Sequence, residues 1–207
     1  MFIKAMFIKT VAMTLLAGIA GLAHSQDGKA LYNTCAACHG QQAEGMPAMH
    51  APALAGQSAS YLARQLRHFK DGLRGTDSAD TYGQQMRAMA AVLPDQAAVE
   101  AVSSYIAALP RTAPAATLSG NTDAGYKQYN MKCGACHGGK AEGNEAFNAP
   151  ALAGVGDAYL LRQFAAFKAG QRGAEQADKY GRQMRMMVNT VTEQELIDLL
   201  SYLNTLK

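Results

Sequence analysis

Apolar residues recur along the chain at helical spacing, in segments that alternate with loops. One predicted helix begins near Ser58, and its apolar face consists of Leu62, Leu66, Phe69 and Leu73. This three- and four-residue spacing is typical of an amphipathic helix. A later segment repeats the face with Leu160, Phe164 and Phe167. Alternating β-branched patterns typical of strands are almost absent, so the sequence predicts an all-α protein with long loops.

Capping residues mark further helices. Thr192-Glu-Gln-Glu195 is a capping box, and the helix that it begins has an apolar face of Leu196, Leu199, Leu200 and Leu203. In the first half of the chain, Asp95 is the predicted N-cap of the corresponding helix. It follows Pro94, an extra residue relative to the second half. Two more helices are predicted to begin near Asp27 and near Asp123.

The chain contains an internal duplication. The segment Ala-Pro-Ala-Leu-Ala-Gly at 51–56 recurs at 149–154, an offset of 98 residues that is expected to persist without a gap. Between residues 51 and 86, 21 of 36 positions are identical to their partners. A repeat of this length predicts two domains rather than a solenoid. We therefore expect domains at 26–109 and 122–207, joined by a linker rich in Pro and small residues at 110–121 that is extended and solvated.

Residues 1–25 have the features of a secretory signal peptide. Lys4 and Lys9 form a positive start, an apolar run follows, and Ala23-His24-Ser25 is a small-x-small cleavage site. The apolar run is shorter than the roughly 20 residues that span a bilayer. We therefore expect export to the periplasm. The alternative is an uncleaved anchor, which would associate the protein with a membrane.

All four cysteines lie in two copies of one motif. Cys35-Ala-Ala-Cys38-His39 and Cys133-Gly-Ala-Cys136-His137 both read C-x-x-C-H, the attachment signature for a c-type haem. Two cysteines at this spacing can form thioethers to one porphyrin, and the next residue, His, then becomes an axial iron ligand. A zinc site would need further paired ligands. The other histidines do not supply them, and His50 and His68 are interpreted as surface or loop residues.

The second axial ligand decides between electron transfer and catalysis. A methionine thioether raises the reduction potential and closes the site, whereas an open position permits ligand binding or peroxide chemistry. Two methionine pairs share the 98-residue offset, namely Met86 with Met184 and Met89 with Met187. The duplication alone does not choose between the pairs, and methionine is also a common packing residue.

The charge pattern gives no indication of a nucleic-acid partner, and none is expected. Without Lys4 and Lys9, 17 of the 19 basic residues remain, against 16 acidic residues, and there is no basic run or aromatic-rich basic face. Three basic pairs recur in both copies and are expected to be solvated, or to reach haem propionates or the other domain. They are Arg64 and Arg162, Lys70 and Lys168, and Arg74 and Arg172.

The ordered set of motifs resembles the dihaem cytochrome c4 family, built from tandem class I cytochrome c domains. Each copy has C-x-x-C-H, A-P-x-L-A-G, a Tyr-Leu helix, Met-x-x-Met and a C-terminal Ser-Tyr helix, and the resemblance covers residues 26–207. It implies that Met86 and Met184 are the axial ligands, with Met89 and Met187 as alternatives. Two features depart from the family pattern. Pro94 replaces a capping Ser, and a Tyr-Gly pair precedes each Met-x-x-Met stretch.

The resemblance also implies supporting residues and a function. The backbone carbonyls of Pro52 and Pro150 would accept a hydrogen bond from the axial histidines. The protein would be an electron carrier rather than an enzyme, with two covalently attached haem c groups, passing single electrons between redox partners in a respiratory chain. The implied partners are a quinol-oxidising complex, a dehydrogenase or a terminal oxidase. The alternatives are a haem subunit of a larger membrane oxidoreductase complex and a haem peroxidase-type enzyme, which the methionine pairs disfavour.

Overall fold

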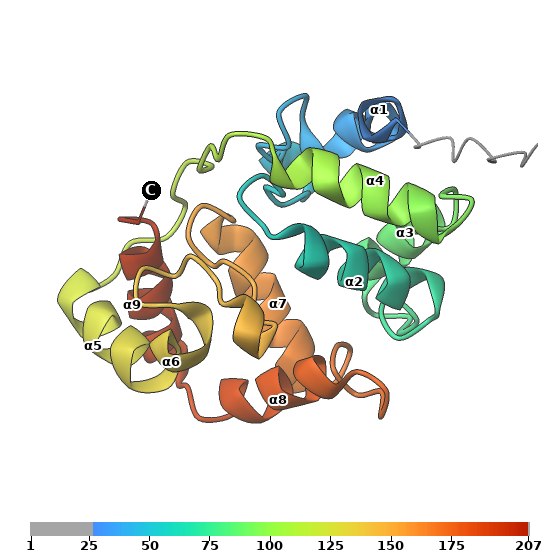
Figure 1. Ribbon diagram of the computed structural model, residues 1–207. Helices are drawn as coiled ribbons and strands as arrows, with labels where there is room; N and C mark the ends of the chain where they lie inside the picture. Colours follow the sequence, from blue (N-terminus) through green and yellow to red (C-terminus); the bar gives the residue numbers. More distant parts are fainter. Residues whose placement is uncertain (1–26, 207) are drawn as a thin grey trace, which may run out of the picture.

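The computed structural model describes residues 27–206, which form two helical domains side by side (Figure 1). Domain 1 contains α1 (Gly28–His39), the short 3-10 helix η1 (Pro47–Met49), α2 (Ala59–Lys70), α3 (Thr81–Ala90) and α4 (Gln96–Ala107). Domain 2 contains α5 (Thr122–Lys132), α6 (Gly134–His137), η2 (Glu145–Phe147), α7 (Asp157–Ala169), α8 (Lys179–Val188) and α9 (Glu193–Leu203). The described range has only two isolated β-bridges, so the all-α prediction is confirmed. The predicted signal peptide lies outside the described residues.

The predicted helix starts agree with the structure in most cases. The side chains of Asp27, Ser58, Asp95 and Thr192 each accept a hydrogen bond from a backbone N–H of the following turn. The capping box at Thr192 is complete. In domain 2, however, the N-cap of α5 is Asn121, and Asp123 lies in the first turn. No helix among the described residues is long and apolar enough to span a membrane.

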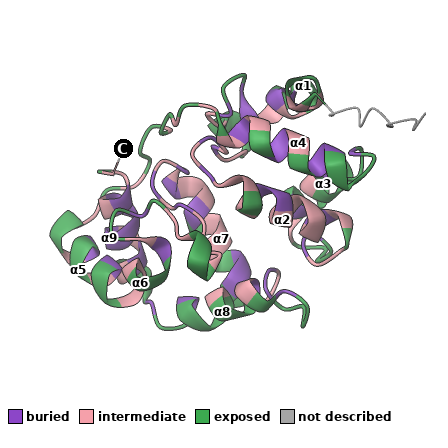
Figure 2. Ribbon diagram, in the orientation of Figure 1, coloured by how far each residue is buried: buried purple, intermediate pink, exposed green. Residues whose placement is uncertain are grey.

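Each domain has its own hydrophobic core. The inner faces of the helices are buried and the outer faces are exposed (Figure 2). In domain 1, α2 contributes the predicted residues Leu62 and Phe69, both buried, whereas Leu73 lies beyond the end of the helix. In domain 2, the predicted face of α9 is buried against α5, with Leu199 and Leu200 each 1% exposed. The two cores are separate clusters, which supports the interpretation of two domains.

A glycine lets the first and last helices of each domain approach closely. A Cβ atom at Gly28 of α1 would lie 2.3 Å from the carbonyl oxygen of Ala101 in α4. A Cβ atom at Gly125 of α5 would lie 2.0 Å from the carbonyl oxygen of Asp198 in α9. Any larger residue at either glycine would push the two helices apart.

These glycines show that the duplication is not free of gaps. Gly28 and Gly125 are 97 residues apart, whereas the two cysteine motifs are 98 residues apart. Domain 2 therefore has one extra residue before its motif, and the helix breaks there. Cys133 has φ −120° and ψ −41°, and α6 begins at the next residue. The expectation of one continuous helix into each motif is correct for α1 and wrong for domain 2.

A second one-residue difference restores the packing. Pro94 is an extra residue in domain 1, so the N-caps Asp95 and Thr192 are also 97 residues apart. The first and last helices of domain 1 are thus both shifted by one residue relative to those of domain 2. Because both members of each packed pair shift together, the glycine contact is preserved in both domains.

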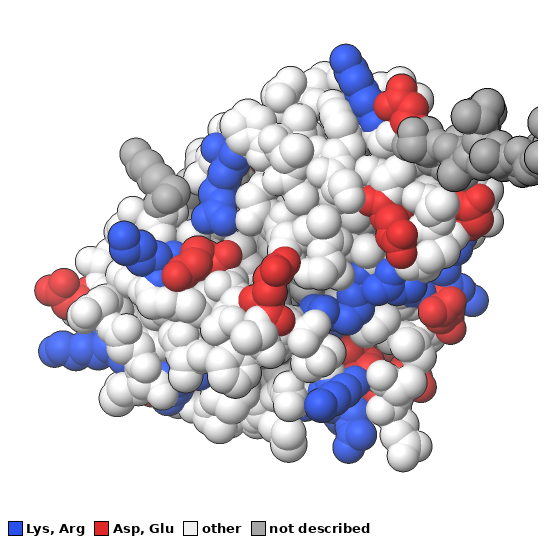
Figure 3. All heavy atoms as spheres, viewed as in Figure 1, with Lys and Arg blue, Asp and Glu red and all other residues white. Residues whose placement is uncertain are grey.

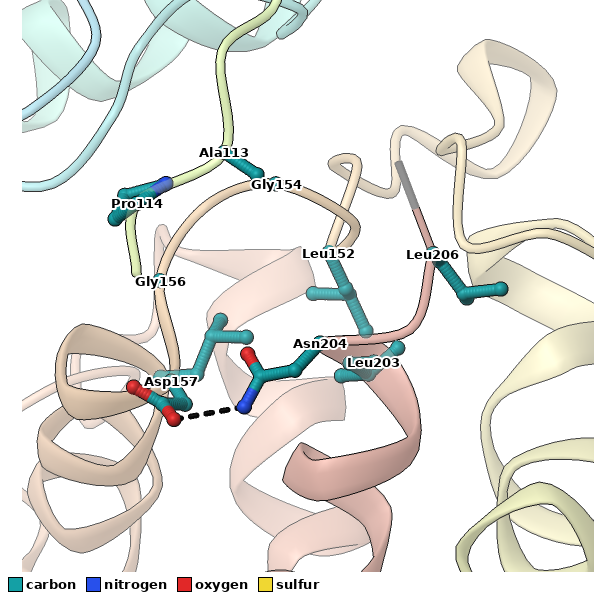
Figure 4. A pocket seen from close by; sticks show the side chains of 10 residues that line it. Ala113, Pro114, Leu152, Gly154, Gly156, Asp157, Leu203, Asn204 and Leu206 are labelled. Carbon is teal, nitrogen blue, oxygen red and sulfur yellow. Dashed lines mark hydrogen bonds between the residues drawn. The ribbon is translucent and has the colours of Figure 1, made fainter. Parts of the chain in front are cut away.

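The linker at 110–121 has no helix or strand, and none of its residues is buried. It is nevertheless tied to domain 2 through the buried carboxylate of Asp157. The backbone N–H groups of Thr117 and Leu118, the Thr117 hydroxyl and the Asn204 amide all donate hydrogen bonds to this carboxylate. Figure 4 shows Asn204 pointing at Asp157 beside a cavity of about 20 Å³, with Ala113 of the linker nearby. The expected solvated linker is therefore anchored at both ends, because Arg111 also donates a hydrogen bond to the carbonyl oxygen of Gly56 in domain 1, at 2.9 Å.

Replacing Asp157 with Ala is expected to lower the free energy of unfolding by about 2–3 kcal/mol, because four donors lose a charged acceptor. Burial by itself raises the pKa of Asp157, but the hydrogen bonds from Asn204 and Thr117 outweigh it and hold the pKa below its usual value. The carboxylate therefore stabilises the fold above about pH 4 and loses this effect as the pH falls. Urea unfolding at several pH values measures the difference.

The matched control is Asp123→Ala, which removes an exposed carboxylate. It is expected to change the free energy of unfolding by less than about 0.5 kcal/mol. Equal losses for both variants at neutral pH would contradict the anchoring role of Asp157.

Candidate haem sites

The two cysteine motifs lie at corresponding helix ends. Cys35 and Cys38 are in the last turns of α1, and His39 is its final residue. In domain 2, Cys136 and His137 lie in the short helix α6. None of the four cysteines forms a disulfide. Each pair is thus available for covalent attachment of a cofactor.

The histidine of each motif is buried and held by a proline carbonyl. His39 Nδ1 donates to the Pro52 carbonyl oxygen at 2.9 Å, and His137 Nδ1 donates to that of Pro150 at 2.9 Å. A carbonyl oxygen can only accept, so Nδ1 carries the proton and Nε2 carries the lone pair. Nε2 of His39 is buried without a hydrogen-bond partner. An iron ligand needs an imidazole in this state.

Burial also fixes the charge of both imidazoles. It lowers the pKa of His39 and of His137, and the carbonyl partner, which acts in the opposite direction, does not compensate. The neutral form therefore predominates at pH 7. Neutral imidazole is the form that binds metals, so the residues present fit a haem iron at Nε2.

A buried tyrosine fixes the turn after each motif, which the sequence interpretation missed. Tyr32 donates its hydroxyl hydrogen to the carbonyl of Gly40 at 2.6 Å, and Tyr129 donates to the carbonyl of Gly138. Burial raises the pKa of both tyrosines, so both remain protonated donors. The sequence contained a signal for this role, because Tyr32 and Tyr129 are 97 residues apart. The two tyrosines do not align, however, when the two copies are aligned on the cysteine motifs, which are 98 residues apart.

Cys35 and Cys133 are half-buried, and their surroundings favour an uncharged sulfur. Burial raises the pKa of the Cys35 thiol, and it raises that of Cys133 to about 11. A thiolate at these positions would be costly because it carries a charge away from water. A thioether is uncharged and has no such cost.

Both methionine pairs lie on helices that the sequence analysis did not predict. Met86 and Met89 are in α3, and Met184 and Met187 are in α8. Met89 and Met187 are each 40% exposed, whereas Met86 and Met184 are half-buried. The structure thus turns the first methionine of each pair inward relative to the second.

The Tyr-Gly pairs belong to the starts of these helices. The carboxylate of Asp80 accepts a hydrogen bond from the Gly83 N–H, and that of Asp178 accepts one from the Gly181 N–H. A Cβ atom at either glycine would lie 2.0 Å from an oxygen of its capping aspartate. Glycine is therefore required for this cap, which sets the start of each methionine helix.

Comparison with known proteins agrees with this geometry. The Cytochrome c family model matches residues 25–110 and 122–207. The chain belongs to the cytochrome c family. It has the tandem arrangement of dihaem cytochrome c4, it carries two covalently attached haem c groups, and it is an electron carrier rather than an enzyme.

Individual relatives cover most of the chain. The cytochrome is 33% identical over 198 residues to the thiosulfate dehydrogenase electron acceptor of Stutzerimonas stutzeri (strain A1501), covering 83% of this chain and 87% of that protein. It is 30% identical over 190 residues to cytochrome c4 of Thiocapsa roseopersicina, covering 87% and 92%. Its fold matches that of reduced recombinant cytochrome c4 from Pseudomonas stutzeri, with a TM-score of 0.70 at 24% identity, covering 88% and 98%.

Two arginines bridge the domains of this cytochrome with near two-fold symmetry. Arg74 donates to Gln65 Oε1 of its own domain at 2.8 Å, and to the Tyr159 hydroxyl and Gln163 Oε1 of domain 2. Arg172 donates in the same way to Gln163, at 2.6 Å, and to Gln65. Both arginines are buried. The bridge confirms that this recurring pair reaches the other domain.

A second arginine pair holds the haem loop of the opposite domain. Arg64 of domain 1 donates to the side chain and the carbonyl of Asn148, at 3.0 and 2.6 Å, and lies 5.0 Å from the ring centroid of Tyr180. Asn148 is two residues before Pro150, and Tyr180 is four residues before Met184. Arg64 therefore contacts both sides of the candidate haem site in domain 2.

Arg162 makes the corresponding contacts in the opposite direction. It donates to the carbonyl of His50 at 2.7 Å and lies 5.3 Å from the ring centroid of Tyr82. His50 and Asn148 both have φ of 54°, a left-handed conformation that turns their carbonyls toward these arginines. The Tyr-Gly pairs that depart from the family pattern are thus part of the domain interface.

The third basic pair has a different role from the one expected. The Nζ atoms of Lys70 and Lys168 donate to the carbonyls of Leu93 and Val191, the residues that precede the last helix of each domain. Both lysines therefore act within their own domain. His68 also differs from its interpretation as a surface residue, because its side chain lies in the interface, with Nδ1 3.7 Å from Asp178.

Gln57 makes an interface contact that has no counterpart in domain 2. Gln57 is buried and exchanges two hydrogen bonds with the backbone of Ala151, next to Pro150, whereas the residue at the matching position in domain 2 is Val155. A cavity of about 270 Å³ beside Gln57 is lined by residues outside both cysteine motifs. Domain 1 therefore holds the haem loop of domain 2 more tightly than the reverse.

Replacing Arg64 with Gln is expected to loosen the haem surroundings of domain 2 specifically. Loss of charged hydrogen bonds worth about 1.4 kcal/mol would make backbone amides in α8 and residues 140–152 exchange about tenfold faster. Native-state hydrogen exchange measures this. The matched variant Arg162→Gln should accelerate exchange in α3 and residues 42–54 instead. Uniform acceleration in both domains by each variant would contradict the crossed arrangement.

Proposed function

We propose that each domain attaches one haem through its cysteine pair and ligates the iron with one histidine and one methionine. The attachment residues are Cys35, Cys38, Cys133 and Cys136. The axial ligands are His39 with Met86 in domain 1 and His137 with Met184 in domain 2. The supporting carbonyls are those of Pro52 and Pro150.

The observation that carries this proposal is that each domain contains both a buried, neutral histidine and a methionine pair whose first member is the less exposed. His39 has its Nδ1 engaged and its Nε2 unpartnered. Met86 is the less exposed methionine of its pair, and domain 2 repeats the arrangement. When bound, each haem supplies a one-electron Fe(III)/Fe(II) couple. Two neutral ligands on stable elements hold the site closed in both states, so little rearrangement accompanies electron transfer.

The proposal includes the place of the protein in the cell. Residues 1–25 are proposed to direct export, leaving domains at 26–109 and 122–207 joined by the linker at 110–121. The mature cytochrome would work in the periplasm and pass electrons between redox proteins of a respiratory chain. Among partner classes, a dehydrogenase is supported as the donor, because two relatives are named thiosulfate dehydrogenase electron acceptors.

Met86→Ala is expected to remove one of two thioether-to-iron charge-transfer bands, halving the absorption of the oxidised protein in that region. The potential of that haem should fall, because a thioether ligand raises it. Carbon monoxide should then bind one iron per reduced chain, whereas the parent protein binds little. The matched variant Met89→Ala should leave all three properties unchanged.

Domain 2 offers an independent repeat of this experiment, with Met184→Ala tested against Met187→Ala. If the second methionine of either pair proves to control the charge-transfer band, the ligand assignment in that domain is wrong. Ready carbon monoxide binding by the parent protein would contradict a closed site in both domains.

The donor assignment predicts reduction by a thiosulfate dehydrogenase. With thiosulfate and catalytic amounts of that enzyme, the oxidised cytochrome should take up two electrons per chain, seen as complete formation of ferrous haem absorbance. Ascorbate reduction of the same sample calibrates the end point. Full reduction by ascorbate without reduction by the enzyme would exclude this donor and leave the electron-carrier function standing.

A further inference from the structure

The helices α3 and α8 are nearly identical, and their differences fall on one face. Six of ten positions match between Thr81–Ala90 and Lys179–Val188. One difference is buried, where Ala90 is replaced by Val188. The other three are exposed in both helices, and the residues in α8 are Lys179, Arg182 and Met186, in place of Thr81, Gln84 and Ala88.

These three positions form a single outward surface, which we call the α8 face. Their spacing of three and four residues places Lys179, Arg182 and Met186 next to one another along the helix. Met186 lies two residues from Met184, which is about 200° around the helix. The α8 face is therefore on the opposite side of the helix from the candidate ligand, and Met186 is 66% exposed.

The charges on this face have no partners in the described part of the chain. Neither the Arg182 side chain nor that of the adjacent Arg185 takes part in a hydrogen bond or ion pair within residues 27–206. The Lys179 ammonium only lies 5.6 Å from the ring centroid of Tyr180. Elsewhere, on the face drawn in Figure 3, basic and acidic side chains are interspersed. The α8 face is thus a local basic patch on a surface of mixed charge.

We propose that the α8 face is the docking surface for an acidic redox protein. Unpaired basic side chains attract an acidic surface and orient the encounter. Met186, which is 66% exposed, supplies flexible apolar contact beside the two basic side chains. A small contact of this kind is typical of transient redox complexes.

This inference rests on the proposed function, because it places the partner close to the haem of domain 2. A helix is about 10 Å thick, so a protein seated on the α8 face is separated from the iron ligand Met184 by one helix only. Each encounter moves one electron between the partner's redox centre and the domain 2 haem, so one is oxidised as the other is reduced. The matching residues of α3, Thr81, Gln84 and Ala88, carry no charge, although Arg87 matches Arg185. Domain 1 therefore exchanges electrons with a different redox partner.

The duplication provides the test, since the three residues of the α8 face can be replaced by those at the matching positions of α3. The variant Lys179→Thr/Arg182→Gln/Met186→Ala makes α8 resemble α3, and Arg87→Gln is the control on α3. The probe is an acidic plant-type [2Fe–2S] ferredoxin. With both proteins oxidised, NMR shift changes in α8 report binding, and with the ferredoxin reduced, stopped-flow absorbance reports haem reduction.

At an ionic strength of about 0.01 M, the triple variant is expected to bind and react about tenfold more slowly than the parent, with a flatter salt dependence. The Arg87→Gln control should match the parent. Unchanged rate and salt dependence in the triple variant would overturn the proposal. Ascorbate reduction of both haems must persist in every variant, and its loss would instead count against the proposed function.

The triple substitution could disturb the methionine ligand of domain 2, which loss of its thioether-to-iron charge-transfer band would reveal. In that case the reverse exchange on α3 still tests the proposal. The variant Thr81→Lys/Gln84→Arg/Ala88→Met creates the same face on α3 and should raise the reaction rate about twofold by opening a second docking surface. No gain would overturn the proposal. Sedimentation of the parent, but not of the triple variant, with phosphatidylglycerol vesicles would assign the α8 face to lipid and would also overturn it.

Discussion

The hydrogen bond from each motif histidine to a proline carbonyl is the contact on which both haem sites depend. It places the proton on Nδ1 and leaves the buried Nε2 of His39 with a lone pair and no protein partner. The carbonyl is 13 residues away along the chain, in a loop with little regular structure. That loop is held by its own isolated β-bridge, and from the other domain by a hydrogen bond from Arg64 or Arg162 to its backbone. Each candidate haem site therefore receives a supporting contact from the opposite domain.

The same dependence explains how the two copies diverged. One extra residue before Cys133 and one at Pro94 both change the register of helices, yet the contacts of Gly28 and Gly125 with the last helices are the same. The central segment between motif and last helix keeps its offset of 98 residues, because it carries the proline, the interface arginines and the methionines together. A shift inside that segment would separate the histidine from its carbonyl, whereas a paired shift at its two ends moves only helices that pack on each other.

Features set by local sequence could be predicted, and features set by contacts between domains could not. The cysteine motifs, the N-caps at Ser58 and Thr192 and the apolar face of α9 are each visible within about ten residues. The helices α3 and α8 were missed because few of their residues are apolar and buried, so no stripe marks them, and a cap from Asp80 or Asp178 defines their start. The position of His68 in the interface depends on a residue 110 positions away, which no local pattern reveals. The more buried methionine of each pair likewise became visible only in three dimensions.

The two domains combine a shared interior with different exteriors. The hydrogen bonds of the tyrosine that fixes the turn and of the aspartate that caps the methionine helix repeat in both domains. Similar surroundings favour similar reduction potentials at the two haems. Two haems of similar potential do not by themselves determine at which domain an electron enters. Direction then has to come from features that the duplication does not share, such as the interface contacts of Gln57 and His68 and the residues that α8 presents to solvent. Exposed positions change at little cost to stability. Divergence of the surface can therefore give two similar haem sites different redox partners without disturbing either site.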